Sequence, residues 1–195
     1  MAARVSSALA LVFFAVQTLA QSPSNDVAYE VVCGAFSGES DLIVCRDATL
    51  SDGENTITAG NLDYERTEST ASGGRIWHLS GGVQVRVGNT LLEAESGVFE
   101  FDLEELVFAE LVGFPVRLTD HDAATDTSFS GSADTISIDV RLTTARLLGR
   151  AVLTRRTGEQ EPDNYEGCDW IYNWGDHSFN AGTPDCGVRL ILTAM

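Results

Sequence analysis

A repeated unit of nearly constant length occupies most of the chain. Each unit runs from a short β-like segment through a turn to a segment of alternating polarity that closes near a glycine. The four units are 35, 32, 36 and 33 residues long and cover 47–81, 82–113, 114–149 and 150–182. Such a repeat indicates stacked supersecondary units, because one unit of this size is too small to bury its own apolar face. We therefore expect function to lie along an extended surface or groove.

Alternation with a period of two identifies the strands. In the clearest case, Val83–Val87, valines alternate with polar residues. The same alternation recurs at 114–119, at 136–140, and near the C-terminus at Val188, Leu190 and Leu192. Turns rich in Gly, Asn, Asp and Ser follow at regular intervals, which predicts an all-β chain. A sheet folded over by successive units would turn its apolar faces toward one another and leave an open strand edge at each end.

One segment is ambiguous between helix and strand. Residues 102–112 have an acidic start and place Leu103, Leu106 and Leu111 at a spacing that a helix would also satisfy. The continuous apolar run at 106–109 and the surrounding repeat favour a pair of strands.

The first twenty residues have the layout of a cleaved secretory signal. Arg4 precedes an apolar stretch at 8–16, and residues 18–20 end in a small residue at the expected cleavage site. The apolar stretch is shorter than the roughly 20 residues that span a bilayer, so a retained anchor is the weaker interpretation. Residues 21–195 would then form one domain or one continuous stack.

The charge of the chain excludes some partners. Twelve basic and 29 acidic residues give a formal net charge of −17, and removal of Arg4 with residues 1–20, which contain no acid, gives −18. Nucleic acid and anionic membrane would both be repelled, so neither is an expected electrostatic partner. If an anionic ligand binds, its apolar part must supply the affinity.

Four cysteines in an exported chain indicate disulfides rather than a metal site. Cys33 and Cys45 flank the turn-like residues 37–41 and would face each other across a hairpin. Cys168 and Cys186 are then left to pair with each other. Two other connectivities stay open on the sequence alone.

No residue pattern predicts catalysis. The three histidines, His78, His121 and His177, have no recognisable catalytic spacing, and nucleophile-elbow, Walker and dinucleotide-binding patterns are absent from the sequence. Asp120, Asp122 and neighbouring residues offer oxygen ligands to a cation, but a solvated acidic loop explains them equally well. We therefore expect no catalytic residue, no metal site, no cofactor and no enzyme activity.

Trp170, Tyr172 and Trp174 share a parity, so their rings should line one side of a strand. Such a row can stack on sugar rings. An exported carbohydrate-binding module or β-repeat enzyme is accordingly an alternative function.

Four glycine-containing steps occur in a fixed order along the chain. They are Leu79–Val85 with Gly88–Glu95, Leu111–Val116, Gly131–Asp139 and Leu147–Leu153. Together they resemble the motifs of periplasmic lipopolysaccharide-transport proteins of the LptA type, which carry the OstA-like domain. The first step is similar to the family's run (F/L)xGNVxVxxGxxxLxAD, the second to GxPAxF and the third to GxADxIxYD. The fourth step repeats the beginning of the first. Gly82 stands where that family usually has Asn, and Glu95 where it usually has Asp. The likeness covers nearly all of the mature chain.

The resemblance implies a fold and a function. The fold would be an elongated half-open β-jellyroll, an antiparallel sheet of units of about 34 residues folded over on itself. The function would be that of a periplasmic bridge protein, which binds lipopolysaccharide and carries the acyl chains of lipid A in an apolar groove from the inner to the outer membrane. An LptC-like component that keeps its N-terminal segment as a membrane anchor is the nearest alternative.

The same resemblance implies partners and a site. LptC-like inner-membrane and LptD-like outer-membrane proteins would join by edge-strand pairing, and copies of the chain could join head to tail. Strand parity assigns ten side chains to the groove. They are Val83, Val85, Val87, Phe99, Phe101, Phe114, Val116, Leu118, Ile136 and Ile138. Such residues either fill a closed core or line an open groove, and the sequence is compatible with both.

Overall fold

The structure, a computed structural model, describes residues 29–39, 42–69, 74–102, 105–183, 186–187 and 189–191. The predicted signal peptide, and Val188 and Leu192 of the last predicted strand, lie outside these residues. Within them no helix is long and apolar enough to cross a membrane. The strands are β1 (Glu30–Glu39), β2 (Leu42–Ser51), β3 (Thr56–Ser69), β4 (Arg75–Val87), β5 (Thr90–Asp102), β6 (Glu105–Asp122), β7 (Thr127–Asp139), β8 (Thr144–Thr157), β9 (Asp163–Asn173), β10 (Ser178–Ala181) and β11 (Arg189–Ile191).

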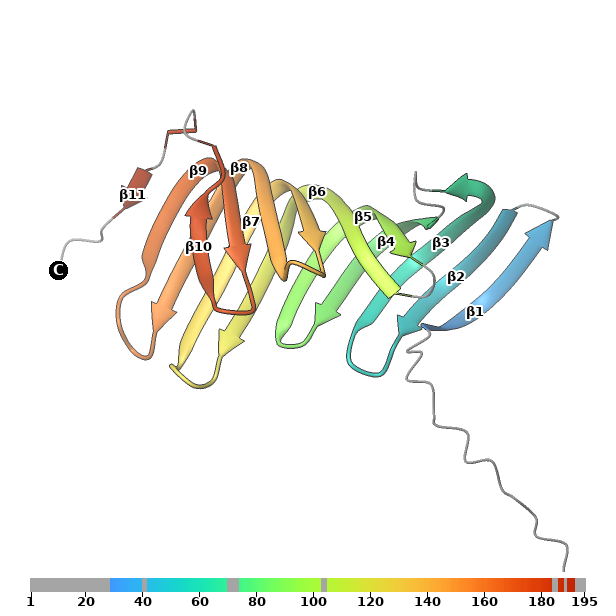
Figure 1. Cartoon of the computed structure of the whole chain (residues 1–195), viewed down its shortest axis with the longest axis horizontal. Coiled ribbons are helices and arrows are strands. Elements are labelled where there is room, and N and C mark those ends of the chain that lie inside the picture. The colour runs from blue at the N-terminus through green and yellow to red at the C-terminus, as the bar shows by residue number, and fades with distance from the viewer. Residues whose placement is uncertain are drawn as a thin grey trace, which may run out of the picture.

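All of these strands belong to one antiparallel sheet. β1 to β10 lie side by side in chain order, and β11 pairs with β9 (Figure 1). Short turns dictate this meander, because strands that they join pair with their sequence neighbours. The all-β prediction is confirmed. The described part of the ambiguous segment is also strand, since Asp102 ends β5 and pairs with Glu105 at the start of β6.

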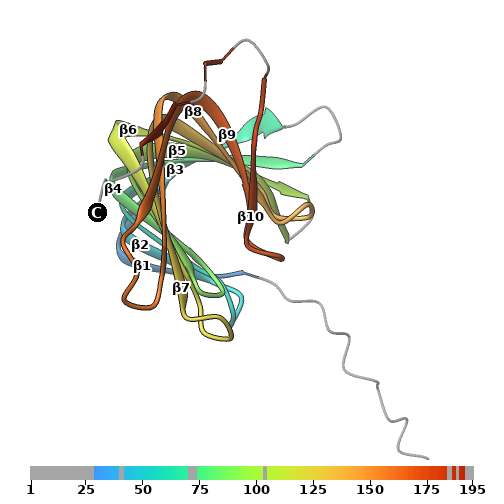
Figure 2. The same cartoon turned by 90° about the vertical axis from the view of Figure 1, so that its left-hand side faces the viewer.

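A line of irregular residues crosses the middle of the strands and folds the sheet over. The register breaks near the centre of every strand pair from β3–β4 to β8–β9. A bulge of this kind bends a strand and increases its twist. The two halves of each long strand therefore lie in two facing layers, and Figure 2 shows the strands curving around a common interior. The predicted folded-over, half-open jellyroll is confirmed.

The two layers are defined by their turns. Layer A holds the turns β2–β3, β4–β5, β6–β7 and β8–β9, and layer B holds the turns β3–β4, β5–β6, β7–β8 and β9–β10. We call the turn-bearing margins of the layers the lips, and the line where the strands bend the fold line.

The glycines that close the repeat units lie on the fold line. Gly81, Gly113 and Gly149 are in the middle of β4, β6 and β8, next to the register breaks. The unit 82–113 thus comprises half of β4, all of β5 and half of β6. In one repeat, the chain runs from the fold line to the lip of layer A, crosses the fold line to the lip of layer B, and returns to the fold line.

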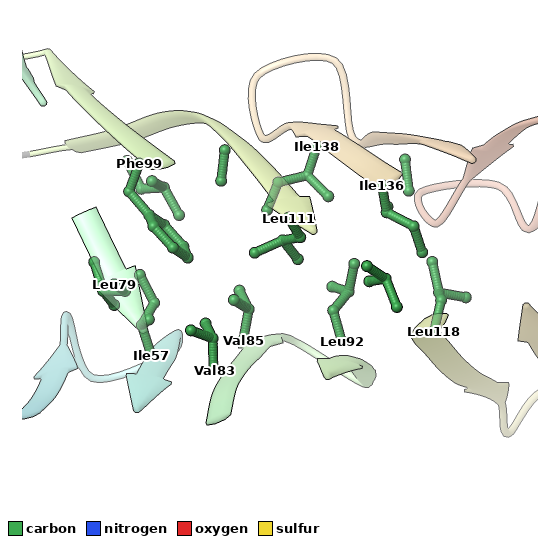
Figure 3. Close-up of a cluster of buried hydrophobic side chains, with 14 of the residues drawn as sticks. Ile57, Leu79, Val83, Val85, Leu92, Phe99, Leu111, Leu118, Ile136 and Ile138 are labelled. Carbon is green, nitrogen blue, oxygen red and sulfur yellow. The ribbon is translucent and has the colours of Figure 1, made fainter. Parts of the chain in front are cut away.

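The inner faces of the two layers pack against each other. In Figure 3, Phe99, Leu111 and Ile138 of layer B point toward Val85 and Leu92 of layer A. All five side chains are at most 1% exposed. Burial of a side chain of this size contributes roughly 1.5–3 kcal/mol, so the contact between layers is the main source of stability.

Both expected disulfides are present, Cys33–Cys45 and Cys168–Cys186. The expectation that Cys33 and Cys45 face each other is wrong, because Cys45 lies opposite Phe36 and Cys33 opposite Ala48. Glu39 pairs with Leu42, which moves the centre of the turn beyond the midpoint of the two cysteines. The bond therefore runs diagonally between the strands.

The two ends of the sheet differ. β1 has no strand on its outer side among the described residues, as the sequence predicted. At the other end β9 has no open edge, since β10 and β11 both pair with its outer side and form a short outermost edge. The chain turns back after β9, and Cys168–Cys186 holds the returning segment against it.

Asp169 of β9 is a buried carboxylate that this returning segment packs against. Its side chain is 3% exposed and accepts hydrogen bonds from Arg146 Nε at 2.9 Å and Nη2 at 2.7 Å. These bonds hold the pKa of Asp169 below its ordinary value, although burial acts in the opposite direction.

We predict that alanine at Gly149 destabilises the fold more than alanine at Gly82. Both glycines have left-handed backbones, with φ of 91° and 87°, where an alanine costs about 1–2 kcal/mol. A Cβ at Gly149 would also overlap the carboxylate of Asp134, whereas a Cβ at Gly82 meets nothing within 4 Å. Urea unfolding should show the larger loss for Gly149→Ala. Equal losses would contradict the close approach at the fold line.

We predict an acid-sensitive contribution from Asp169. Because its pKa is lower in the folded chain, its stabilising effect is complete well above the ordinary value of 3.8 and is lost as the pH falls through the folded pKa. Asp169→Asn removes this effect at every pH. The difference in unfolding free energy between the wild type and Asp169→Asn should therefore shrink as the pH is lowered from neutrality to below about 4. A difference that does not change with pH would rule the contribution out.

Candidate functional site

Most of the residues that parity assigned to a groove lie together in the interior. Phe101, Val116, Leu118 and Ile136 are at most 2% exposed, like the interior residues already described. Val87 is half-buried and packs against this core. One contiguous apolar interior therefore extends along the sheet between the layers, and it is closed to solvent along this row.

Phe114 does not belong to the interior. Its side chain is 78% exposed, and the parity prediction for it is wrong. The register of β6 with β7 breaks between Val112 and Val116, so the alternation restarts at the fold line. Gly113 is buried there, while Phe114 and Pro115 are both exposed.

The parity list also missed much of the interior. The omitted residues lie in β2, β3 and β8, which supplied none of the predicted groove residues, or elsewhere in β4 to β7. They are Leu50, Ile57, Leu62, Leu79, Leu92, Leu106, Ala109, Leu111, Ala133, Ala145, Leu147, Ala151 and Leu153. The alternation of apolar and polar residues was present in the sequence, but the bulges at the fold line interrupt it in the long strands.

A hydrogen-bonded cluster joins the lips near the C-terminal end. Asp120 of layer A is buried, with a side chain 1% exposed. Its Oδ2 accepts a 2.5 Å hydrogen bond from the Tyr172 hydroxyl of layer B and lies 3.1 Å from His177 Nδ1. Its Oδ1 accepts the backbone N–H of His121 at 2.8 Å. We call Asp120, Tyr172 and His177 the latch.

The surroundings of the latch keep the Tyr172 hydroxyl protonated. Burial raises the pKa of Tyr172, and its hydrogen bond to the Asp120 carboxylate raises it further. The ring of Phe129, from layer A, lies 5.1 Å from that of Tyr172 and 5.9 Å from that of His177. A charged acceptor, a fixed donor and stacked rings therefore connect the layers here.

At the N-terminal end the lips meet through aromatic rings. Tyr29 of layer A contacts Phe101 of layer B edge to face, with ring centroids 5.3 Å apart. Burial raises the pKa of Tyr29, and the nearby Asp52 carboxylate adds to the effect. Burial acts to raise the pKa of Asp52, but hydrogen bonds from Asn55, the Glu54 backbone and Tyr29 together outweigh it and lower that pKa. This contact has no buried carboxylate at its centre, in contrast to the latch.

A cavity of about 380 Å³ opens between the lips beside these rings. Tyr29 and Asn55 line it from layer A, and Leu106, Val140 and Arg141 line it from layer B. Leu106 is 5% exposed and belongs to the interior. The cavity therefore connects a polar margin, which includes the cation of Arg141, with the edge of the apolar interior.

Two indole N–H groups within the protein have no hydrogen-bond partner among the described residues. They belong to Trp77 and Trp170, and both nitrogen atoms are buried. A buried donor left unpaired costs about 1–3 kcal/mol. An oxygen of a bound ligand would remove this cost.

The aromatic row of β9 is not a surface platform. Trp170 and Tyr172 are 4% and 0% exposed, and Trp174 is half-buried against the core. Trp170 instead packs against Tyr165 and Phe179, with ring centroids 6.0 and 5.9 Å away. These rings are therefore not available to stack on a polysaccharide in solvent.

The acidic loop at 120–126 is organised by its own hydrogen bonds. Asp122 accepts from the backbone N–H of Ala124 at 2.9 Å and from the Thr125 hydroxyl at 2.6 Å. No group of three or more His, Cys, Asp or Glu side chains is placed to hold a metal ion in the described ranges.

Comparison with solved structures finds a similar chain in the crystal structure of LptH, the LptA homologous periplasmic component of the conserved lipopolysaccharide transport device from Pseudomonas aeruginosa. The two chains are 13% identical, the alignment covers 88% of this chain and 100% of that chain, and the TM-score is 0.41. No family model matches the sequence, and no curated protein matches it. A likeness this weak does not identify a functional site. The function is therefore inferred from the apolar interior, the lips and the edges of the sheet.

We predict that Tyr172→Phe destabilises the fold and loosens the latch. The substitution leaves a buried carboxylate without its shortest hydrogen bond, which costs about 1.5–3 kcal/mol. Tyr165→Phe is the matched control on the same strand, because the Tyr165 hydroxyl has no hydrogen-bond partner among the described residues. Chemical denaturation should show a loss for Tyr172→Phe and a change within about 0.5 kcal/mol for the control. Similar losses in both would mean that the latch contributes nothing.

Proposed function

We propose that the interior binds the acyl chains of an amphipathic lipid between the two layers. The observation that carries the proposal is the continuous apolar interior, bounded by lips that no strand pairing joins, so that the lips could separate with every strand pair intact. Every strand pair lies within the sheet, and contacts between the layers are made by side chains alone. A hydrocarbon chain could replace these contacts at little cost, because each methylene group that leaves water contributes about 0.8 kcal/mol.

The polar part of the lipid would remain at the lips. The cavity beside Tyr29 joins the solvent-facing Arg141 to the interior at Leu106. The chain is strongly acidic, with a formal net charge of −17, so a phosphorylated headgroup gains little from general electrostatics. Affinity would come from the acyl chains, and the unpaired indoles of Trp77 and Trp170 would donate to ester or hydroxyl oxygens.

The ordered motifs of the sequence favour one lipid, lipopolysaccharide, and one process, its transport across the periplasm toward the outer membrane. In this proposal the chain is an LptA-like periplasmic protein, and the groove residues of the prediction, apart from Phe114, contact lipid A. The two disulfides fit an oxidising compartment. An LptC-like partner would pair with the open edge of β1.

We predict that a photoreactive benzoylphenylalanine at Phe99 crosslinks to lipopolysaccharide saturably. Phe99 is fully buried between the layers, and Glu100, on the same strand with its side chain on the opposite face, is the matched control. Crosslinking at Phe99 should fall when unlabelled lipopolysaccharide is added and should persist when the deacylated saccharide is added instead. The same crosslinking experiment with labelled phospholipid vesicles distinguishes a site specific for lipid A from a site that binds any acyl chain.

Two outcomes of the crosslinking experiment would contradict the proposal. If the folded variant with the probe at Phe99 gives no more crosslinking than the variant with the probe at Glu100, the interior does not bind lipid. If phospholipid crosslinks as efficiently as lipopolysaccharide, acyl binding stands and the specific substrate is wrong.

A further inference from the structure

The outer side of β9 is covered along nearly its whole length. β11 pairs with Asn164–Glu166, and β10 pairs with Trp170–Asn173. Between them, Cys168 forms its disulfide and the carbonyl of Asp169 accepts the backbone N–H of Gly182 at 2.9 Å. No continuous row of backbone groups is left on β9 for another strand.

Gly182 shows how closely the returning segment is applied to β9. A Cβ at this position would overlap the carboxylate of Asp169, which Arg146 already holds from the other side. β10 and β11, which lie outermost, have four and three residues. Short edge strands of this kind are poor templates for pairing.

The interior is also closed at this end. Phe179 of β10 lies 4.7 Å from Tyr165, measured between ring centroids, and these two rings come from opposite layers. Trp170 packs against both rings. We call Tyr165, Trp170 and Phe179 the plug.

β1 presents the opposite situation. It is ten residues long and pairs with β2 through nine residue pairs, while its outer side carries no strand among the described residues. Val31, Val32 and Phe36 are 40%, 55% and 66% exposed. Val31 lies opposite Leu50, and Phe36 opposite Cys45, both of which are buried, so the apolar interior ends in exposed side chains here.

Charge decides which strand can pair with β1. The sequence of β1, EVVCGAFSGE, has an acidic residue at each end and no basic residue. A second copy in antiparallel alignment would bring Glu30 of one chain toward Glu39 of the other, and each chain carries a net charge of −17. Opposed like charges destabilise a strand pair. A second copy also has no free β9 edge to offer.

We propose that β1 accepts an edge strand of a different protein, and that this strand is apolar along its centre and basic at its ends. The covered outer side of β9 prevents copies of the chain from joining head to tail. This partner class rests on the strand-pairing part of the proposed function and not on lipid binding. The chain would thus be a terminal subunit of any strand-linked assembly, and neither head-to-tail copies nor a strand of an LptD-like protein would add to β9.

The test uses the mature, oxidised protein without lipid. Benzoylphenylalanine is placed at Val32 of β1 or at Asn180 of β10, both exposed positions, and each variant is first checked for a wild-type circular dichroism spectrum. The probes are two ten-residue peptides with the same valine-rich centre, one with arginine and the other with glutamate at both ends. Sedimentation velocity of the unmodified protein in low-salt buffer measures self-association.

We expect a monomer at every concentration, and crosslinking of the arginine peptide at Val32 that exceeds that of the glutamate peptide by at least about tenfold. We expect no peptide crosslinking at Asn180. A concentration-dependent series of oligomers, equal crosslinking of the two peptides, or crosslinking at Asn180 equal to that at Val32 would each overturn the proposal. Because lipid is absent from every arm, failure of the lipid-binding proposal leaves these outcomes unchanged.

Discussion

The fold line is the constraint on which the rest of the structure depends. A single sheet with one apolar face is unstable in water unless that face is covered, and this chain contributes no helix among its described residues to cover it. Bending every long strand at its centre lets the sheet cover itself. Register breaks make the bend at the same level in the strand pairs from β3–β4 to β8–β9, and left-handed glycines lie at this level in β4 and β8. One local backbone feature therefore produces both the interior and the two lips.

Strands connect the two layers only at the fold line. The layers can therefore move apart only at the lips. The latch and the Tyr29–Phe101 contact oppose this separation with different strengths. Loss of the hydrogen bond from Tyr172 to Asp120 costs up to about 3 kcal/mol, while burial of about four methylene groups returns a similar free energy. An acyl chain is long enough to compensate for an opened latch. It would meet less resistance at the cavity beside Tyr29, where the lips are joined by the contact between the Tyr29 and Phe101 rings.

Within half a strand, the sequence was sufficient to place side chains. Val83 and Val85, or Ile136 and Ile138, face the interior because a pleated strand alternates strictly between bulges. Phe114 was misplaced because parity was carried across the fold line, where alternation restarts. The sequence marked that line with glycines, but a glycine is equally compatible with a turn, and only the pairing of neighbouring strands shows that Gly81, Gly113 and Gly149 lie in mid-strand. The covered end of the sheet was not foreseeable, since it depends on how β10 and β11 return onto β9.

The difference between the two ends changes how lipid could pass through such a molecule. In a stack with two open ends, an acyl chain would slide along the interior from one end to the other. Here the plug joins both layers across the last strands, while the exposed apolar side chains of β1 continue the interior to the open edge. In the proposed function, a chain that entered beside β1 would not leave past Phe179 and Tyr165 without breaking the pairing of β10 with β9 as well as the ring contacts. Leaving between the lips would break only side-chain contacts, among them the hydrogen bonds of the latch. Release through the lips therefore has the lower cost, and in this protein the latch, rather than the end of the sheet, would control it.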